Sequence, residues 1–182
     1  ARALLGMRAM RERYLGWSIA RPVLWAALCG LLVAGLGVAT GLTWGTGYGA
    51  ARAIIDGSHA PLWFGPAKFL ATLASAACGL PGGIFAPSLS TGAGIGGMLR
   101  VLFPGEPGGA VVLLGMAAYF TGVVRAPLTA VIIIAESTGS RALILPLFLA
   151  ALLAHWVSSF VCRERLYHGL SREWLEGLRK RG

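Results

Sequence analysis

Several long runs of the chain contain no charged residue. Residues 22–51, 69–99, 107–124 and 142–162 lack Asp, Glu, Lys and Arg altogether. A helix that spans a bilayer needs about 20 consecutive residues, most of them apolar, and each run is near that length or longer. The pattern therefore predicts a chain that crosses a membrane several times.

Glycine, proline and charged residues divide the apolar runs into helices of unequal length. The predicted helices are residues 3–15, 22–42, 48–56, 61–78, 84–102, 110–121, 127–137, 142–161 and 167–180. Several of them are too short to span a bilayer alone, which is typical of half-helices that enter the membrane from opposite sides. We therefore predict an all-α, polytopic membrane fold of about nine helices, some of them broken or re-entrant.

Two breaks fall inside the apolar runs. The first is residues 43–47 (TWGTG), where the alternative is a continuous helix with a contact stripe of glycines at every fourth position. Those glycines are Gly37, Gly41, Gly45 and Gly49. The second break, residues 79–83, lies in the middle of the uncharged run 69–99. Because backbone groups without partners are costly in hydrocarbon, we expect this loop to lie inside protein or against a polar cavity.

The composition is that of a membrane protein, with 56% hydrophobic and 13% charged residues. The net charge of +9 would favour a nucleic-acid partner in a soluble protein, but most of the 16 Lys and Arg residues lie before residue 22 or after residue 162. Basic residues gather on the cytoplasmic side of membrane proteins, so we expect a lipid bilayer as partner and no nucleic acid. In this interpretation residues 1–21 are a basic cytoplasmic helix end and loop, residues 22–162 the membrane helices, and residues 163–182 a C-terminal helix that reaches the cytoplasm.

No residue pattern favours an enzyme, a metal site or a cofactor. Cys29, Cys78 and Cys162 are odd in number and widely spaced, which fits buried thiols better than disulfides or metal ligands. Residues 92–97 match the dinucleotide pattern GxGxxG, but no strand precedes them and no acid follows at the required distance. Gly92 and Gly96 are better explained as close-packing positions in a membrane helix.

Residues 81–87 (PGGIFAP) combine the second break with the start of a helix. The first amides of a helix have no intrahelical acceptor and lie at the positive end of the helix dipole. The N–H groups of Ile84 and Phe85 could therefore hold an anion, while Gly82 and Gly83 allow close approach and unusual dihedral angles. From the physics alone, a simple helix kink explains this segment equally well.

Residues 82–89 (GGIFAPSL), followed by Gly92-Ala93, resemble the signature loop of the CLC family of chloride channels and chloride/proton exchangers. A second motif, residues 125–129 (RAPLT), is preceded by Gly122 and followed by an Ile-rich helix that ends at residues 136–138 (EST). This motif resembles a later helix of the same family. The order and spacing of both motifs match those of the family over nearly the whole chain. The resemblance implies that the chain is the second of the family's two inverted structural repeats.

The resemblance implies an anion site built from more than one segment. Ile84 and Phe85 would bind the chloride, and the hydroxyl of Tyr167 would be a further ligand, with an interfacial belt tyrosine as the alternative for Tyr167. The anion loop would be supported by its other residues, Gly82, Gly83, Ala86 and Pro87. The family's serine ligand and gating glutamate belong to the first repeat. Since the chain begins at Ala1 rather than Met, we expect the sequence to be incomplete and this repeat to precede it.

Three residues of the second motif are expected to have structural roles. An arginine buried in a membrane costs about 2.5–3.5 kcal/mol and demands partners, so Arg125 should cap carbonyls of a neighbouring helix. Pro127 suits the first turn of its helix, where a missing N–H costs little. Glu136 is an acid inside the apolar region and thus a functional candidate, but its position at a helix end favours structural hydrogen bonding.

By resemblance, the intact protein transports chloride across a membrane without a cofactor, as a homodimer with one pore in each subunit. Residues 131–134 are a candidate for the dimer face, with lipid contact as the alternative. The short C-terminus favours a chloride/proton antiporter of the bacterial inner (plasma) membrane, with both ends of this segment in the cytoplasm. A passive chloride channel and a non-transporting membrane subunit or truncated remnant are the alternatives.

Overall fold

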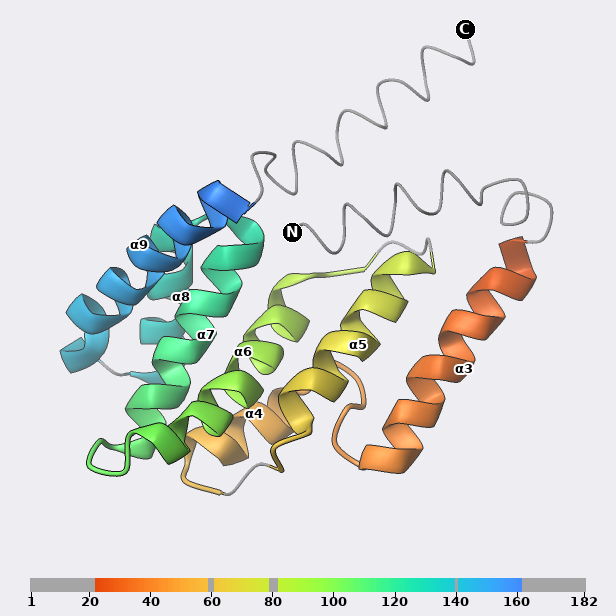
Figure 1. Ribbon diagram of the computed structural model, residues 1–182, viewed down its shortest axis with the longest axis horizontal. Coiled ribbons are helices and arrows are strands. Elements are labelled where there is room, and N and C mark those ends of the chain that lie inside the picture. Colours follow the sequence, from red (N-terminus) through yellow and green to blue (C-terminus); the bar gives the residue numbers. More distant parts are fainter. Residues whose placement is uncertain (1–21, 59–60, 79–81, 140, 162–182) are drawn as a thin grey trace, which may run out of the picture.

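The computed structural model describes residues 22–58, 61–78, 82–139 and 141–161, and these residues form helices without any strand (Figure 1). The α-helices are α3 (Pro22–Thr40), α4 (Tyr48–Ile55), α5 (Phe64–Ala77), α6 (Phe85–Leu99), α7 (Gly108–Val124), α8 (Pro127–Thr138) and α9 (Ile144–Val161). Short 3-10 helices, Arg100–Leu102 and Arg141–Leu143, follow α6 and precede α9. The all-α prediction is confirmed.

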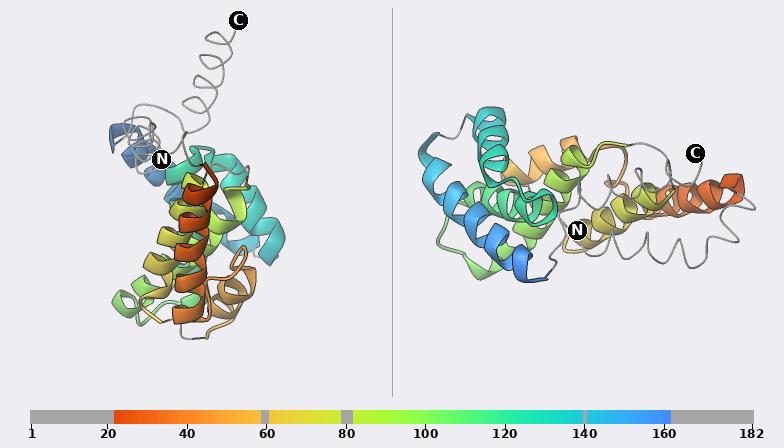
Figure 2. Two further views of the ribbon diagram at one scale, coloured as in Figure 1. Left: turned by 90° about the vertical axis from the view of Figure 1, so that its right-hand side faces the viewer. Right: turned by 90° about the horizontal axis from the view of Figure 1, so that it is seen from above.

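The helices form a row with two more behind it. Helices α3, α5, α6, α7 and α9 lie side by side, while α4 packs behind α6 and α8 behind α7 and α9 (Figures 1 and 2). At one end of the row α3 packs on α5, where the indole N–H of Trp25 donates to the backbone oxygen of Ala77 at 3.0 Å. Helix α6 therefore occupies the middle of the row.

Glycines let α6 approach the backbones on both of its sides. A Cβ atom added to Gly94 would lie 2.7 Å from the Cα of Gly65 on α5. On the opposite side, a Cβ on Gly92 would lie 2.7 Å from the Cα of Met116 on α7, and a Cβ on Gly96 would lie 2.8 Å from the Cα of Val112. The prediction that Gly92 and Gly96 are close-packing positions is confirmed.

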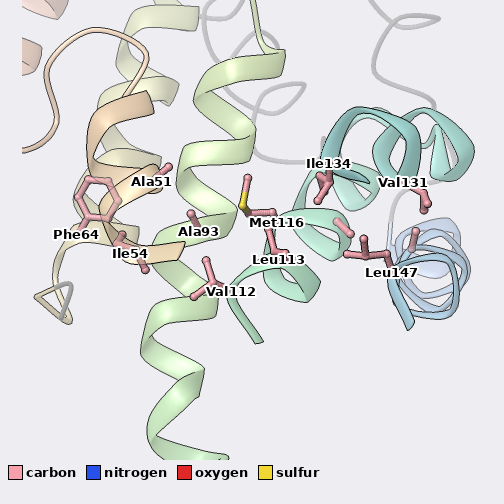
Figure 3. Packing of buried hydrophobic residues seen from close by; sticks show 12 residues of the cluster. Ala51, Ile54, Phe64, Ala93, Val112, Leu113, Met116, Val131, Ile134 and Leu147 are labelled. Atoms are coloured by element: carbon pink, nitrogen blue, oxygen red, sulfur yellow. The ribbon is translucent and has the colours of Figure 1, made fainter. Parts of the chain in front are cut away.

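The buried apolar core extends from α4 and α5 through α6 and α7 to α8 and α9 (Figure 3). Its members include Ala51, Ile54, Phe64, Ala93, Val112, Leu113, Met116, Ala117, Val131, Ile134, Leu147 and Ala151. Val131 and Ile134 are buried in this core, so residues 131–134 present only Ile132 as an exposed side chain. Of the four residues predicted as a dimer or lipid face, Val131 and Ile134 therefore pack inside the chain, and the assignment of this face to a dimer remains a prediction.

The outermost helices carry long apolar surfaces. Within the described chain, Val23–Thr40 and Arg141–Val161 are long and apolar enough to cross a membrane, and only 6% and 11% of their most apolar windows are buried. Gly108–Val124 and Pro127–Thr138 are shorter apolar helices. Leucines and aromatic residues exposed to this extent are typical of contact with lipid rather than with water.

The connection between α3 and α4 is a true break. Helix α3 ends at Thr40, and Gly41, Gly45 and Gly47 have φ angles of 67°, 53° and 78°. Other L-residues adopt such angles only at a cost, and glycine does so freely. The predicted break at residues 43–47 is confirmed, and the alternative of a continuous glycine stripe is wrong.

Candidate functional site

The first turn of α6 has the geometry of a helix N-terminus that offers amides to a ligand. The first bond along the helix runs from the N–H of Ser88 to the oxygen of Ile84 at 3.0 Å, and Pro87 has no N–H. The amides of Ile84, Phe85 and Ala86 therefore precede the helix's own hydrogen-bond ladder. They lie at the positive end of the α6 dipole, where an anion is stabilised.

This first turn lies inside the row of helices. The ring of Phe85 contacts the ring of Phe120 on α7, with centroids 5.2 Å apart and an angle of 35° between the planes. Phe120 comes four residues before Val124, where α7 ends. Figure 1 shows the same arrangement, with α6 beginning between α5 and α7 and short of both their ends. The N-terminal end of α6 therefore lies between neighbouring helices.

One side of the turn is open within the described part of the chain. Gly82, Gly83 and Ala86 are exposed, Ile84 and Pro87 are half-buried, and the Phe85 side chain is 41% exposed. An added Cβ on Gly82 or Gly83 would meet nothing within 4 Å. Gly83 has no positive φ, so its backbone conformation does not in itself require glycine. The lack of a side chain at Gly82 and Gly83 instead leaves room for close approach to the amides.

Tyr167, the expected side-chain ligand, lies outside the described residues. The same holds for the basic segments 1–21 and 163–182 and for residues 79–81 of the loop before α6. Gly82 and Gly83 precede α6, Ile84 is its N-cap, and Phe85, Ala86 and Pro87 are its first residues. Arg125, Pro127 and Glu136 belong to other helix ends.

Arg125 joins the ends of α7 and α9. Its backbone is left-handed, with φ 60° and ψ 38°, and its N–H caps α7 by donating to the oxygen of Thr121 at 2.8 Å. The guanidinium group donates to the backbone oxygen of Ser158 at 2.6 Å and to its hydroxyl at 3.3 Å. The Ser158 hydroxyl donates in turn to the oxygen of Gly122 at 2.8 Å, so Ser158 links Arg125 to the last turn of α7. Pro127 is the first residue of α8, where its missing N–H leaves no gap.

We expect the substitution Arg125→Gln to lower the thermal stability of the full-length protein without changing its halide affinity. Hydrogen bonds from a charged donor are worth about 1.5–3 kcal/mol, and glutamine cannot keep both contacts with Ser158. Thermal unfolding and chloride calorimetry measure the two effects separately. A loss of halide affinity in a variant of unchanged stability would instead place Arg125 in the anion path.

Glu136 lies exposed in the last turn of α8. The hydroxyls of Ser137 and Thr138 both donate to the backbone oxygen of Ile134, at 3.2 and 2.6 Å. No hydrogen bond from the described chain reaches the Glu136 carboxylate. Its structural hydrogen-bonding role remains a prediction.

Lys68 is a polar residue of the interior that the sequence did not single out. It lies on α5 with 2% of its surface exposed and donates to backbone oxygens of the α3–α4 connection. In the sequence, Lys68 is marked only as the single cation that borders the uncharged run 69–99. Among the described residues, no group of three or more His, Cys, Asp or Glu side chains could hold a metal ion.

A sequence model of the family described as voltage gated chloride channel matches residues 1–159. The match includes both sequence motifs and nearly all of the described helices, and it covers most of the chain. Members of this family are chloride channels and transporters of membranes rather than enzymes. With its helical fold and apolar outer helices, the chain is an integral membrane protein and belongs to the voltage gated chloride channel family.

Proposed function

We propose that the protein moves chloride across a membrane and that the first turn of α6 holds the ion on its way. Family membership supports chloride transport. The observation that carries the site is the position of α6, whose first turn begins between α5 and α7 and short of both their ends (Figure 1). Amides bind a halide through oriented partial charges, without a full positive charge that would hold it too tightly.

The open side of the first turn suits a site that is completed by other ligands. Phe85 packs on one side against Phe120, while Gly82, Gly83 and Ala86 remain exposed. A chloride held here would need further donors to replace its hydration shell. In our proposal these come from Tyr167 and from the family's first repeat, which we expect in the same protein before Ala1.

We propose chloride/proton antiport in the intact protein. The test is chloride efflux from liposomes that contain the full-length protein, with simultaneous recording of the external pH. Chloride efflux with coupled proton uptake is the expected result. Efflux without proton movement would identify a passive channel, and no flux of any anion would favour a non-transporting subunit or remnant.

The substitution Tyr167→Phe should weaken chloride binding while preserving the fold. The phenol would donate its O–H to the anion, and phenylalanine keeps the ring without this donor. Chloride calorimetry on the full-length protein checks the affinity, and size-exclusion chromatography checks the fold. Unchanged affinity would remove Tyr167 from the site and favour its interpretation as an interfacial tyrosine.

The assembly proposed for the intact protein is a homodimer with one pore in each subunit, in a bacterial inner membrane with both ends of this segment cytoplasmic. Helices α8 and α9 offer apolar side chains for such a contact, including Leu128, Ile132, Leu149 and Leu153. Lipid can cover the same surface. Cysteine crosslinking between copies at Ile132 would separate the two cases, because only a dimer face gives a crosslinked pair.

A further inference from the structure

Lys68 is a buried cation whose partners in the described chain are backbone oxygens. Its ammonium group donates to the oxygen of Thr43 at 2.9 Å and to the oxygen of Gly45 at 2.7 Å. The ion pair that forms among the described residues, Arg52 with Asp56, is exposed and involves other side chains. A buried ammonium needs several acceptors to offset its lost hydration, and here the α3–α4 connection supplies them.

The same connection is held from a second helix. The hydroxyl of Ser90 on α6, which is also 2% exposed, donates to the oxygen of Gly47 at 3.1 Å. A Cβ added to Gly47 would lie 2.8 Å from the Cε of Lys68 and would collide with the Ser90 hydroxyl. The α3–α4 connection, α5 and α6 therefore pack closely together at Gly47, where a side chain would not fit.

This point lies close to the start of α6. Ser90 follows Phe85 by five residues, which corresponds to about 7.5 Å along the helix axis. About one and a half turns of helix separate the two residues, and such a short segment moves as a rigid unit. The position of Ser90 therefore sets the position of the first turn of α6. The Phe85 contact with Phe120 constrains that turn from the α7 side.

From this geometry we propose that Lys68 is a positioning residue for the anion site, acting through the α3–α4 connection and Ser90. Lys68 fixes the oxygens of Thr43 and Gly45, the connection presents the Gly47 oxygen to Ser90, and Ser90 fixes α6 along its axis. The inference rests on the proposed anion site at the first turn of α6. Misplacement of binding groups by about 1 Å can cost up to about a hundredfold in function, so a residue that fixes the helix from a distance can have a large effect.

The test compares chloride affinity by calorimetry in the full-length protein and in four variants. Lys68→Met removes the donors and should lower the affinity about tenfold or more, while Lys68→Arg should restore most of it. Ser90→Ala removes a neutral donor to the same connection and should lower the affinity in the same direction. Thr72→Val is the control, because the Thr72 hydroxyl donates only to the Lys68 backbone oxygen on its own helix, and its affinity should match the unmodified protein.

Two results would overturn the proposal. Wild-type affinity in folded Lys68→Met would make Lys68 a local anchor only. A loss in Lys68→Met with none in Ser90→Ala would mean that Lys68 acts through its charge and not through the position of α6. If Lys68→Met fails to fold, unchanged affinity in Ser90→Ala would overturn the proposal.

Hydrogen exchange gives a readout that does not depend on chloride binding. If Lys68 and Ser90 position α6, amide exchange at residues 41–47 and at residues 82–88 should change together. Exchange at both segments should stay slow in Lys68→Arg and become faster in Ser90→Ala. Faster exchange at residues 41–47 with no change at residues 82–88 would contradict the proposal. If the unmodified protein binds no chloride, the proposed function is refuted. The exchange result would still decide whether Lys68 and Ser90 position α6.

Discussion

The substitution Gly94→Val should lower the stability of the folded protein and its yield. A Cβ at this position would lie 2.7 Å from the Cα and 2.8 Å from the nitrogen of Gly65. These are backbone atoms, so α5 and α6 would have to move apart along the whole contact. Overpacking of this kind costs about 1–3 kcal/mol or more and would also disturb the neighbouring contact of α6 with α7.

The measurement is the yield of monodisperse full-length protein in size-exclusion chromatography, followed by thermal unfolding. Gly35→Ala is the matched control, because Gly35 is exposed on α3 and an added Cβ meets nothing within 4 Å. Alanine is the better helix former, so this control should keep or slightly raise the stability. Equal yields and melting temperatures for both variants would show that the close approach of α5 and α6 is not required.

The substitution Ile84→Pro should lower the chloride affinity by roughly ten- to a hundredfold. Proline removes the Ile84 N–H, and a hydrogen bond to a charged group is worth about 1.5–3 kcal/mol. The backbone can accept it with a modest rotation, because the φ of Ile84 is −96° where proline prefers about −65°. The preceding residue is Gly83, which tolerates the restriction that a following proline imposes.

Ile84→Ala separates the amide from the side chain, since it shortens the side chain and keeps the N–H. We expect this variant to bind chloride nearly as well as the unmodified protein when both are compared by calorimetry. Circular dichroism of both variants checks that α6 still forms. If the proline and alanine variants had the same affinity, the Ile84 amide would not contact the ion.

Much of the helical architecture follows from local patterns. Proline, glycine and charge marked the ends of most helices within a few residues, as for α5 (Phe64–Ala77), predicted as 61–78. The break after α3 could also be predicted, because residues 43–47 combine glycines with polar residues that disfavour a helix in lipid. Local patterns suffice here because a membrane helix must form its backbone hydrogen bonds within its own segment.

Long-range contacts were harder to predict. The sequence indicated Arg125 as a capping residue, but its left-handed backbone and its partner Ser158 depend on how α7 and α9 cross. The burial of Val131 and Ile134 likewise depends on the packing of α8, and an Ile-rich run fits lipid, dimer and core equally well. These features are set by tertiary packing, which hydrophobicity alone does not specify.

The site shows the same division. The proposed anion loop was predicted from its glycines, its helix start and its resemblance to the family, and the structure confirms the helix start, at Phe85. Lys68 and Ser90 could not be predicted, because their partners are backbone oxygens of Thr43, Gly45 and Gly47, more than 20 residues away in the chain. A backbone acceptor leaves no residue type in the sequence that would reveal the contact.

The most direct test of the anion site is anomalous X-ray scattering from crystals of the full-length protein grown or soaked in bromide. We expect a bromide peak within hydrogen-bond distance of the Ile84 and Phe85 amides at the start of α6. Bromide peaks elsewhere along the protein, with none at this helix start in a preparation that transports chloride, would contradict it.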